Sequence, residues 1–158
     1  MYKGLRQFSS EDPTPALASL EIAAQQMEVS VKEMHWVIDD MRDPRVSIHE
    51  SLGAAREASG DYKGAIAAYD FTTTLPKGSK AYYRAGILFG KMAASAWAAR
   101  RPSEALGYFI EAKKRIGQAK ELPQNVTPSE RVEYLAYLDQ TITFLKGAKI
   151  EPLPLPGK

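Results

Sequence analysis

The fold is decided by residues 47–76, which read SIHESLGAAREASGDYKGAIAAYDFTTTLP. Ser47 followed three positions later by Glu50 predicts a capping box at a helix start, where each side chain satisfies a free backbone donor. Small and apolar residues then recur three or four positions apart, as they do along one face of a helix: Ile48, Leu52, Ala55 and Ser59. Gly60 is expected to end this helix in the left-handed conformation, which costs glycine little.

A second short helix is expected directly after this glycine. Asp61 is suited to cap its start, and Pro76 to end it, because proline cannot continue a helix. The same spacing returns between them, at Tyr62, Ala65, Ile66, Tyr69 and Thr72. Two short amphipathic helices with a tight turn form an antiparallel hairpin.

The hairpin resembles one tetratricopeptide repeat (TPR). This family has Leu-Gly early in the first helix, a Gly-Asp/Asn-Tyr turn, then Ala, an aromatic residue and Ala in the second helix, and a closing Pro. The matching residues here are Leu52, Gly53, Gly60, Asp61, Tyr62, Ala65, Tyr69 and Pro76. Thr72 stands where the family prefers Ala, and Arg56 where it prefers Tyr.

A second, weaker unit follows. Residues 79–99 and 103–121 are each predicted to be helical, and Ala105, Phe109 and Ala112 lie 40 positions after Ala65, Tyr69 and Thr72. The family period is about 34 residues. Met92-Ala93 stands in place of Leu-Gly, and Arg100-Arg101 in place of the glycine turn. The resemblance therefore covers about two repeats.

Flanking helices are expected on both sides. Thr14-Pro15 is typical of a helix start, and apolar residues at 3-4 spacing extend from Leu17 to Met41, so we predict a helix of about 28 residues that ends at Asp43-Pro44. It either packs against the following helices or forms a homodimer. Thr127 and Glu130 predict a second capping box, followed by a C-terminal capping helix with Val132, Leu135, Leu138, Ile142 and Leu145 on its apolar face.

Length and composition exclude several kinds of chemistry and of protein. The chain has 158 residues, a net charge of +2 and no cysteine, which excludes disulfides and thiolate chemistry. No stretch approaches the roughly 18 apolar residues of a membrane span, and residues 1–13 do not resemble a signal peptide, so we expect a cytoplasmic protein. We predict a flexible arm over 1–13, a single all-α, TPR-like superhelical domain over 14–147, and an extended Pro-rich tail over 148–158.

Catalytic and metal-binding patterns are weak in this sequence. The two histidines, His35 and His49, are 14 positions apart and belong to no zinc-binding motif. The basic residues 113–115 share their predicted helix with glutamates, which favours a solvated surface over a nucleic-acid site. We therefore expect no enzymatic activity, cofactor or metal, and neither nucleic acid nor a membrane as partner.

The resemblance implies the function and its site. In TPR proteins the first helix of each repeat lines a concave groove that receives an extended peptide or a helix of a partner protein. Carried over to this chain, the groove residues are Glu50, Ala54, Glu57, Ile87, Lys91, Ala94 and Trp97. Trp97 is the candidate anchor. The alternative is burial in the core against the closing helix, where large aromatic residues are more often found. The alternative functions are homodimerisation through 17–41 and service as a helical accessory domain of a larger enzyme.

Overall fold

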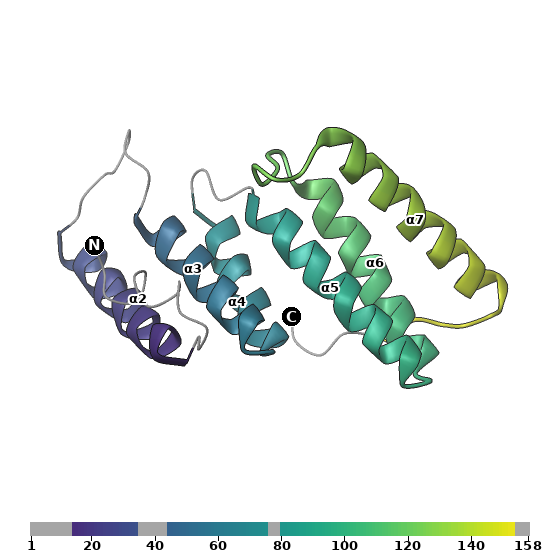
Figure 1. The fold of residues 1–158 in the computed structure, drawn as a ribbon, viewed down its shortest axis with the longest axis horizontal. Coiled ribbons are helices and arrows are strands. Elements are labelled where there is room, and N and C mark those ends of the chain that lie inside the picture. Colours follow the sequence, from purple (N-terminus) through teal and green to yellow (C-terminus); the bar gives the residue numbers. More distant parts are fainter. Residues whose placement is uncertain (1–13, 35–43, 76–79, 154–158) are drawn as a thin grey trace. The chain divides into compact units, whose positions relative to one another are not determined.

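The computed structural model describes residues 14–34, 44–75 and 80–153 (Figure 1). These residues form six helices and no strand, which confirms the all-α class. The contacts divide the chain into two compact units, Met1–Ala81 and Tyr82–Lys158, which are taken in turn below. The predicted arm over 1–13 lies outside the described residues, and a single domain over 14–147 stays a prediction.

The first unit contains α2 (Thr14–Met34), α3 (Pro44–Ala58) and α4 (Tyr62–Thr73). Helix α3 packs against both of the others. The buried residues that hold them together are mostly small: Leu20, Ala23, Ala24, Ile48, Leu52, Ala55 and Ala68. Leu17 and Met27 pack against this cluster. The part of the long N-terminal helix predicted beyond Met34 falls on residues that the structure does not describe.

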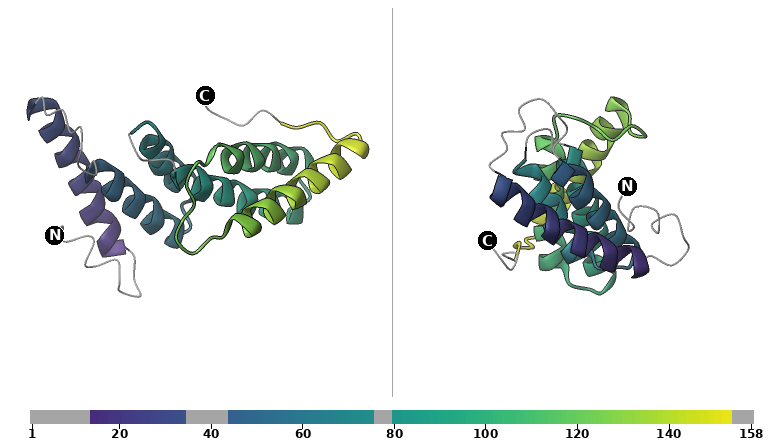
Figure 2. Two further views of the ribbon diagram at one scale, coloured as in Figure 1. Left: turned by 90° about the horizontal axis from the view of Figure 1, so that it is seen from above. Right: turned by 90° about the vertical axis from the view of Figure 1, so that its left-hand side faces the viewer.

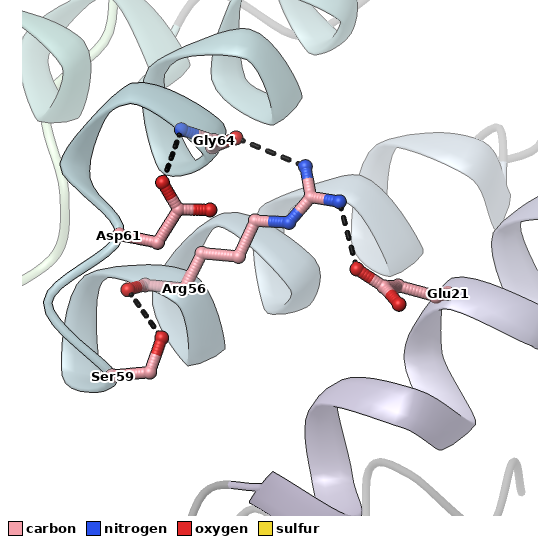
Figure 3. A network of polar contacts seen from close by, with 5 residues as sticks. All are labelled: Glu21, Arg56, Ser59, Asp61 and Gly64. Atoms are coloured by element: carbon pink, nitrogen blue, oxygen red, sulfur yellow. Dashed lines mark hydrogen bonds and ion pairs between the residues drawn. The ribbon is translucent and has the colours of Figure 1, made fainter.

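Arg56 ties the three helices of this unit together (Figure 3). Its guanidinium donates to the backbone carbonyl of Gly64 in α4 at 3.1 Å and to the Glu21 carboxylate in α2 at 2.8 Å. Arg56 occupies the position at which the repeat pattern has Tyr. A charged side chain therefore links the helices here in place of an aromatic one.

The predicted capping box at Ser47 is wrong. Helix α3 begins three residues earlier, at Pro44, so Ser47 lies inside it and cannot cap it. Proline fits the first position of a helix, where its fixed φ is already helical and its missing N–H would have no partner anyway. Pro44 therefore marks a helix start. The helix end that was predicted before it falls on residues 35–43, which the structure does not describe.

The hairpin turn forms as predicted. Gly60 has φ +82°, its N–H donates to the carbonyl of Glu57, and the N–H of Asp61 donates to the carbonyl of Arg56. This pair of hydrogen bonds is the Schellman motif, which satisfies the last carbonyls of a helix. The Asp61 carboxylate then accepts from the Gly64 N–H at 2.9 Å and caps α4.

The second unit contains α6 (Pro102–Gln118), α7 (Pro128–Gly147) and all but the first two residues of α5 (Lys80–Ala98). Helix α5 packs on α6, where the rings of Phe89 and Tyr108 lie 6.2 Å apart. Helix α7 runs antiparallel to α6 and contacts it (Figures 1 and 2).

The turn between α5 and α6 repeats the turn between α3 and α4 at an offset of 40 residues. Arg100 has φ +58°, its N–H donates to Trp97, and the N–H of Arg101 donates to Ala96. Ala65 and Ala105 are both fully buried, and Tyr69 and Phe109 are both buried one turn later. The two hairpins therefore share their turn and their main buried positions, as the sequence offset predicted.

Helix α7 starts with the predicted capping box. The Thr127 hydroxyl accepts from the Glu130 N–H, and the Glu130 carboxylate accepts from the Thr127 N–H. Leu138, Ile142 and Leu145 are buried as expected, but Val132 is 65% exposed, so its place on the apolar face is wrong. Backbone hydrogen bonds hold the start of the predicted solvated tail: Ala148, Lys149 and Ile150 donate to carbonyls in the last turn of α7, and the Leu153 N–H donates to the Ser103 carbonyl.

Candidate functional site

The predicted groove residues of the first unit lie on α3. Glu50, Ala54 and Glu57 are all partly buried and recur at a spacing of four and three, so they follow one side of the helix. Those of the second unit lie on α5. The two sets belong to different units, so the residues of each unit form a set of their own.

On α5 the predicted residues form an accessible face. Ile87 is partly buried, whereas Lys91, Ala94 and Trp97 are exposed. The indole of Trp97 is 48% exposed, so its burial against the closing helix, the alternative considered above, is wrong. Trp97 is the exposed large apolar residue of α5.

Tyr134 of α7 borders this face and was missed by the sequence argument. A Cβ atom at Gly90 would meet the Tyr134 hydroxyl, so α7 approaches α5 at the glycine that lies seven positions before Trp97. The Tyr134 ring stacks on Tyr137, with centroids 6.0 Å apart and planes at 17°. The glycines at 86 and 90 predict that another helix comes close to this one, but nothing in the sequence indicates that Tyr134 makes the approach.

Burial raises the pKa of the Tyr134 hydroxyl, with smaller contributions from Tyr137 and Tyr83. The pKa of Tyr83 on α5 is raised as well, first by burial and then by the negative charge of Glu130. Both phenols are therefore neutral in the physiological range. Tyr83 is buried, whereas Tyr134 is partly exposed. Helix α5 itself contains Lys80, Arg84 and Lys91 and no acidic residue.

Of the other polar residues singled out in the sequence, His49 and the basic group 113–115 have described neighbours, and His35 lies outside the described residues. His49 Nε2 lies 3.9 Å from a Glu28 oxygen, and its ring lies on Phe71 with centroids 4.1 Å apart. The basic group 113–115 pairs with acids: Lys113 with Asp139, and Lys114 and Arg115 with Glu111. Within the described ranges, no group of three or more His, Asp or Glu residues is arranged to hold a metal ion.

None of the helices in the described part of the chain is long and apolar enough to cross a membrane.

The apolar residues from Leu17 to Met41 form the seam that was considered for homodimerisation, and part of this seam is covered by other helices of the same chain. Leu20 and Ala24 are buried, and Leu17 and Met27 pack on the same cluster with α3. These four positions favour packing against the following helices. The seam positions from Val31 onward have no described side chains.

Comparison with protein-family models, with curated proteins and with solved structures finds no match to this chain.

Proposed function

We propose that this chain is a non-catalytic, TPR-like module that binds a peptide or helix of a partner protein. The repetition of the hairpin supports the architecture, because α3–α4 and α5–α6 share a Schellman turn and buried positions at an offset of 40 residues. Stacked hairpins of this kind bury one face against their neighbours and leave the first helices available for partners.

The observation that carries the proposal is the exposure of Trp97. A Trp side chain that is 48% exposed leaves a large apolar surface in water, and its burial by a ligand is favourable. Trp is also the residue type most often found as an energetic hot spot of interfaces. Lys91 and Ala94 on the preceding turns of α5 supply a charged group and an open surface beside it.

The proposal is tested by selecting peptides on the full chain from a random displayed library. Trp36 and Trp97 are the only tryptophans, so a Trp36→Phe variant leaves Trp97 as the sole indole reporter. Selected peptides should shift or quench its emission in a saturable way. A library that yields no binder, or binders that leave the Trp97 emission unchanged, would contradict the proposal.

A further inference from the structure

Acidic residues of α2 contact basic residues of α3 at two places. The Glu21 carboxylate lies 2.8 Å from the Arg56 guanidinium, and Oε1 of Glu28 lies 3.9 Å from Nε2 of His49. The two acids are seven residues apart on α2, and their partners are seven residues apart on α3 in the reverse order. The two helices are therefore antiparallel here, and the contacts lie two turns apart, about 10 Å along the axis.

The contact between Glu28 and His49 is enclosed. The Glu28 side chain is 30% exposed and the His49 side chain is 12% exposed. Within the described residues, Oε1 of Glu28 is buried and has no hydrogen-bond partner. A separation of 3.9 Å is too long for a hydrogen bond, so the attraction between the two groups depends on the charge of the imidazole. A protonated ring supplies this charge, and its bond to a carboxylate is about twice as strong as that of a neutral ring.

Phe71 of α4 contacts the same imidazole. The two rings lie with centroids 4.1 Å apart and planes at 32°. The face of an aromatic ring carries partial negative charge, which attracts a cation within about 6 Å. The His49 ring thus contacts a carboxylate from α2 and an aromatic ring from α4, and both favour its protonated form. Burial alone favours the neutral form, so the protonated ring depends on these two contacts.

The other charged residues close to His49 along α3 and α4 are Arg45, Glu50 and Asp70. Arg45 lies one turn before His49 and opposes its protonation, whereas Glu50, the next residue, and Asp70, beside Phe71 in the sequence, favour it. The described side chains of α2, residues 15–30, include no charged group besides the two glutamates. The acids around the ring therefore outnumber the bases.

We propose that protonation of His49 fastens the C-terminal half of α2 to α3 and α4, so that the docking of α2 depends on pH. Histidine changes its charge between about pH 5 and pH 8. The imidazolium gains the contact with Glu28 only in the docked state, so the added stability is present at low pH and is lost as the pH rises and the ring loses its proton.

Arginine stays charged throughout this range, so the pair of Glu21 and Arg56 holds the other half of α2 at either pH. Loss of the proton from His49 therefore loosens one half of the helix and leaves the other in place. The loosened half covers part of the buried cluster, including Ala24 of α2 and Ile48 of α3. This inference lies within the first unit and does not depend on the binding role proposed for Trp97.

The test is amide hydrogen exchange of α2 in the full chain at about pH 5.5 and about pH 8. Exchange rates are converted to opening equilibrium constants, which removes the intrinsic pH dependence of exchange. Amides near Glu28 should open about two- to five-fold more often at the higher pH, the effect expected of a partly exposed ion pair. His49→Gln and Glu28→Gln should each remove this difference and give open fractions at low pH as high as those at high pH.

Two variants serve as controls. Glu21→Gln removes the other acid of α2, so it should loosen the helix at both pH values and keep the ratio between them. His35→Gln removes the second of the two histidines and should leave the pH dependence unchanged. Opening that is independent of pH in the native chain would overturn the inference. A pH dependence that survives His49→Gln or Glu28→Gln, or that His35→Gln abolishes, would overturn it as well.

Discussion

Gly53 of α3 lies directly against the ring of Tyr69 in α4, so closely that a Cβ atom at position 53 would be 2.5–2.8 Å from three ring atoms. Tyr69 is fully buried, and a shift of its ring would disturb the packing around it. The hairpin of the first unit therefore closes at this distance only because position 53 has no side chain.

Gly53→Ala is expected to destabilise the first unit, although alanine is the better helix former by about 1 kcal/mol. The overpacking against Tyr69 should outweigh that gain and leave a net loss of about 1–2 kcal/mol in the free energy of unfolding. Urea denaturation measures it. Gly117→Ala in α6, where a Cβ meets nothing within 4 Å, is the control and should be neutral or stabilising. A stabilising Gly53→Ala would contradict the packing described here.

Ala65 is fully buried at the centre of the same hairpin. Ala65→Leu should force the helices apart and lower the free energy of unfolding by about 1–3 kcal/mol. Ala67→Leu is the matched control on α4, because residue 67 is exposed and the substitution is the same. If the two variants were equally stable, the proposed register of α4 on α3 would be wrong.

Arg100 occupies the left-handed conformation that Gly60 occupies in the first hairpin, with φ +58° against +82°. Residues with a side chain pay roughly 1 kcal/mol for this conformation. Arg100→Gly should therefore raise the midpoint of thermal unfolding, by the equivalent of about 0.5–1 kcal/mol, and Gly60→Ala should lower it by a similar amount. A lower thermal midpoint for Arg100→Gly together with a higher one for Gly60→Ala would show that the two turns are not equivalent.

Glu130 makes the start of α7 sensitive to acid. The Thr127 backbone N–H, and then the Thr127 hydroxyl, hold the pKa of this carboxyl below its ordinary value of 4.5. A carboxylate with a lowered folded-state pKa adds stability above the unfolded value, and this stability is lost as the pH falls through the folded value.

The thermal midpoint of Glu130→Gln should thus fall below that of the native chain at neutral pH, and the gap should narrow below pH 4.5. Glu151→Gln, in the segment after α7, is the control and should show no gap at either pH. A gap that stays constant down to pH 3 would rule out the capping carboxylate as its cause.

Local chemistry made most of the helices predictable. Gly60, Asp61 and the Thr127–Glu130 box act within four residues of themselves, so their roles can be read from the chain. The 40-residue offset was also visible, because Ala65 and Ala105 are buried at equivalent places in two similar hairpins.

The burial of residues along one helix was harder to predict, because it depends on the direction of each side chain around the helix axis. Val132, Leu135 and Leu138 are three residues apart, and each such step turns about 60° short of a full circle. Two steps in succession set Val132 about 120° away from Leu138, which explains why it is exposed while Leu138 is buried. An apolar stripe holds its direction only when steps of three and four alternate.

Contacts between distant segments were not predictable. The sequence gives no sign that Arg56 reaches Glu21 across 35 positions, or that Tyr134 approaches Gly90. The exposure of Trp97 was likewise open, since burial of a large aromatic residue depends on which helix covers it. The approach of Tyr134 and the exposure of Trp97 shape the candidate site on α5, and so the site was less predictable than the fold.

The central claim is that Trp97 anchors a partner on α5, and the affinity of one selected peptide for two variants tests it most directly. Loss of a hot-spot aromatic residue costs about 2 kcal/mol or more, so Trp97→Ala should weaken binding by about 30-fold or more. Ile22→Ala, another exposed apolar position, should bind as the native chain does. Equal affinities for Trp97→Ala and the native chain would contradict the claim.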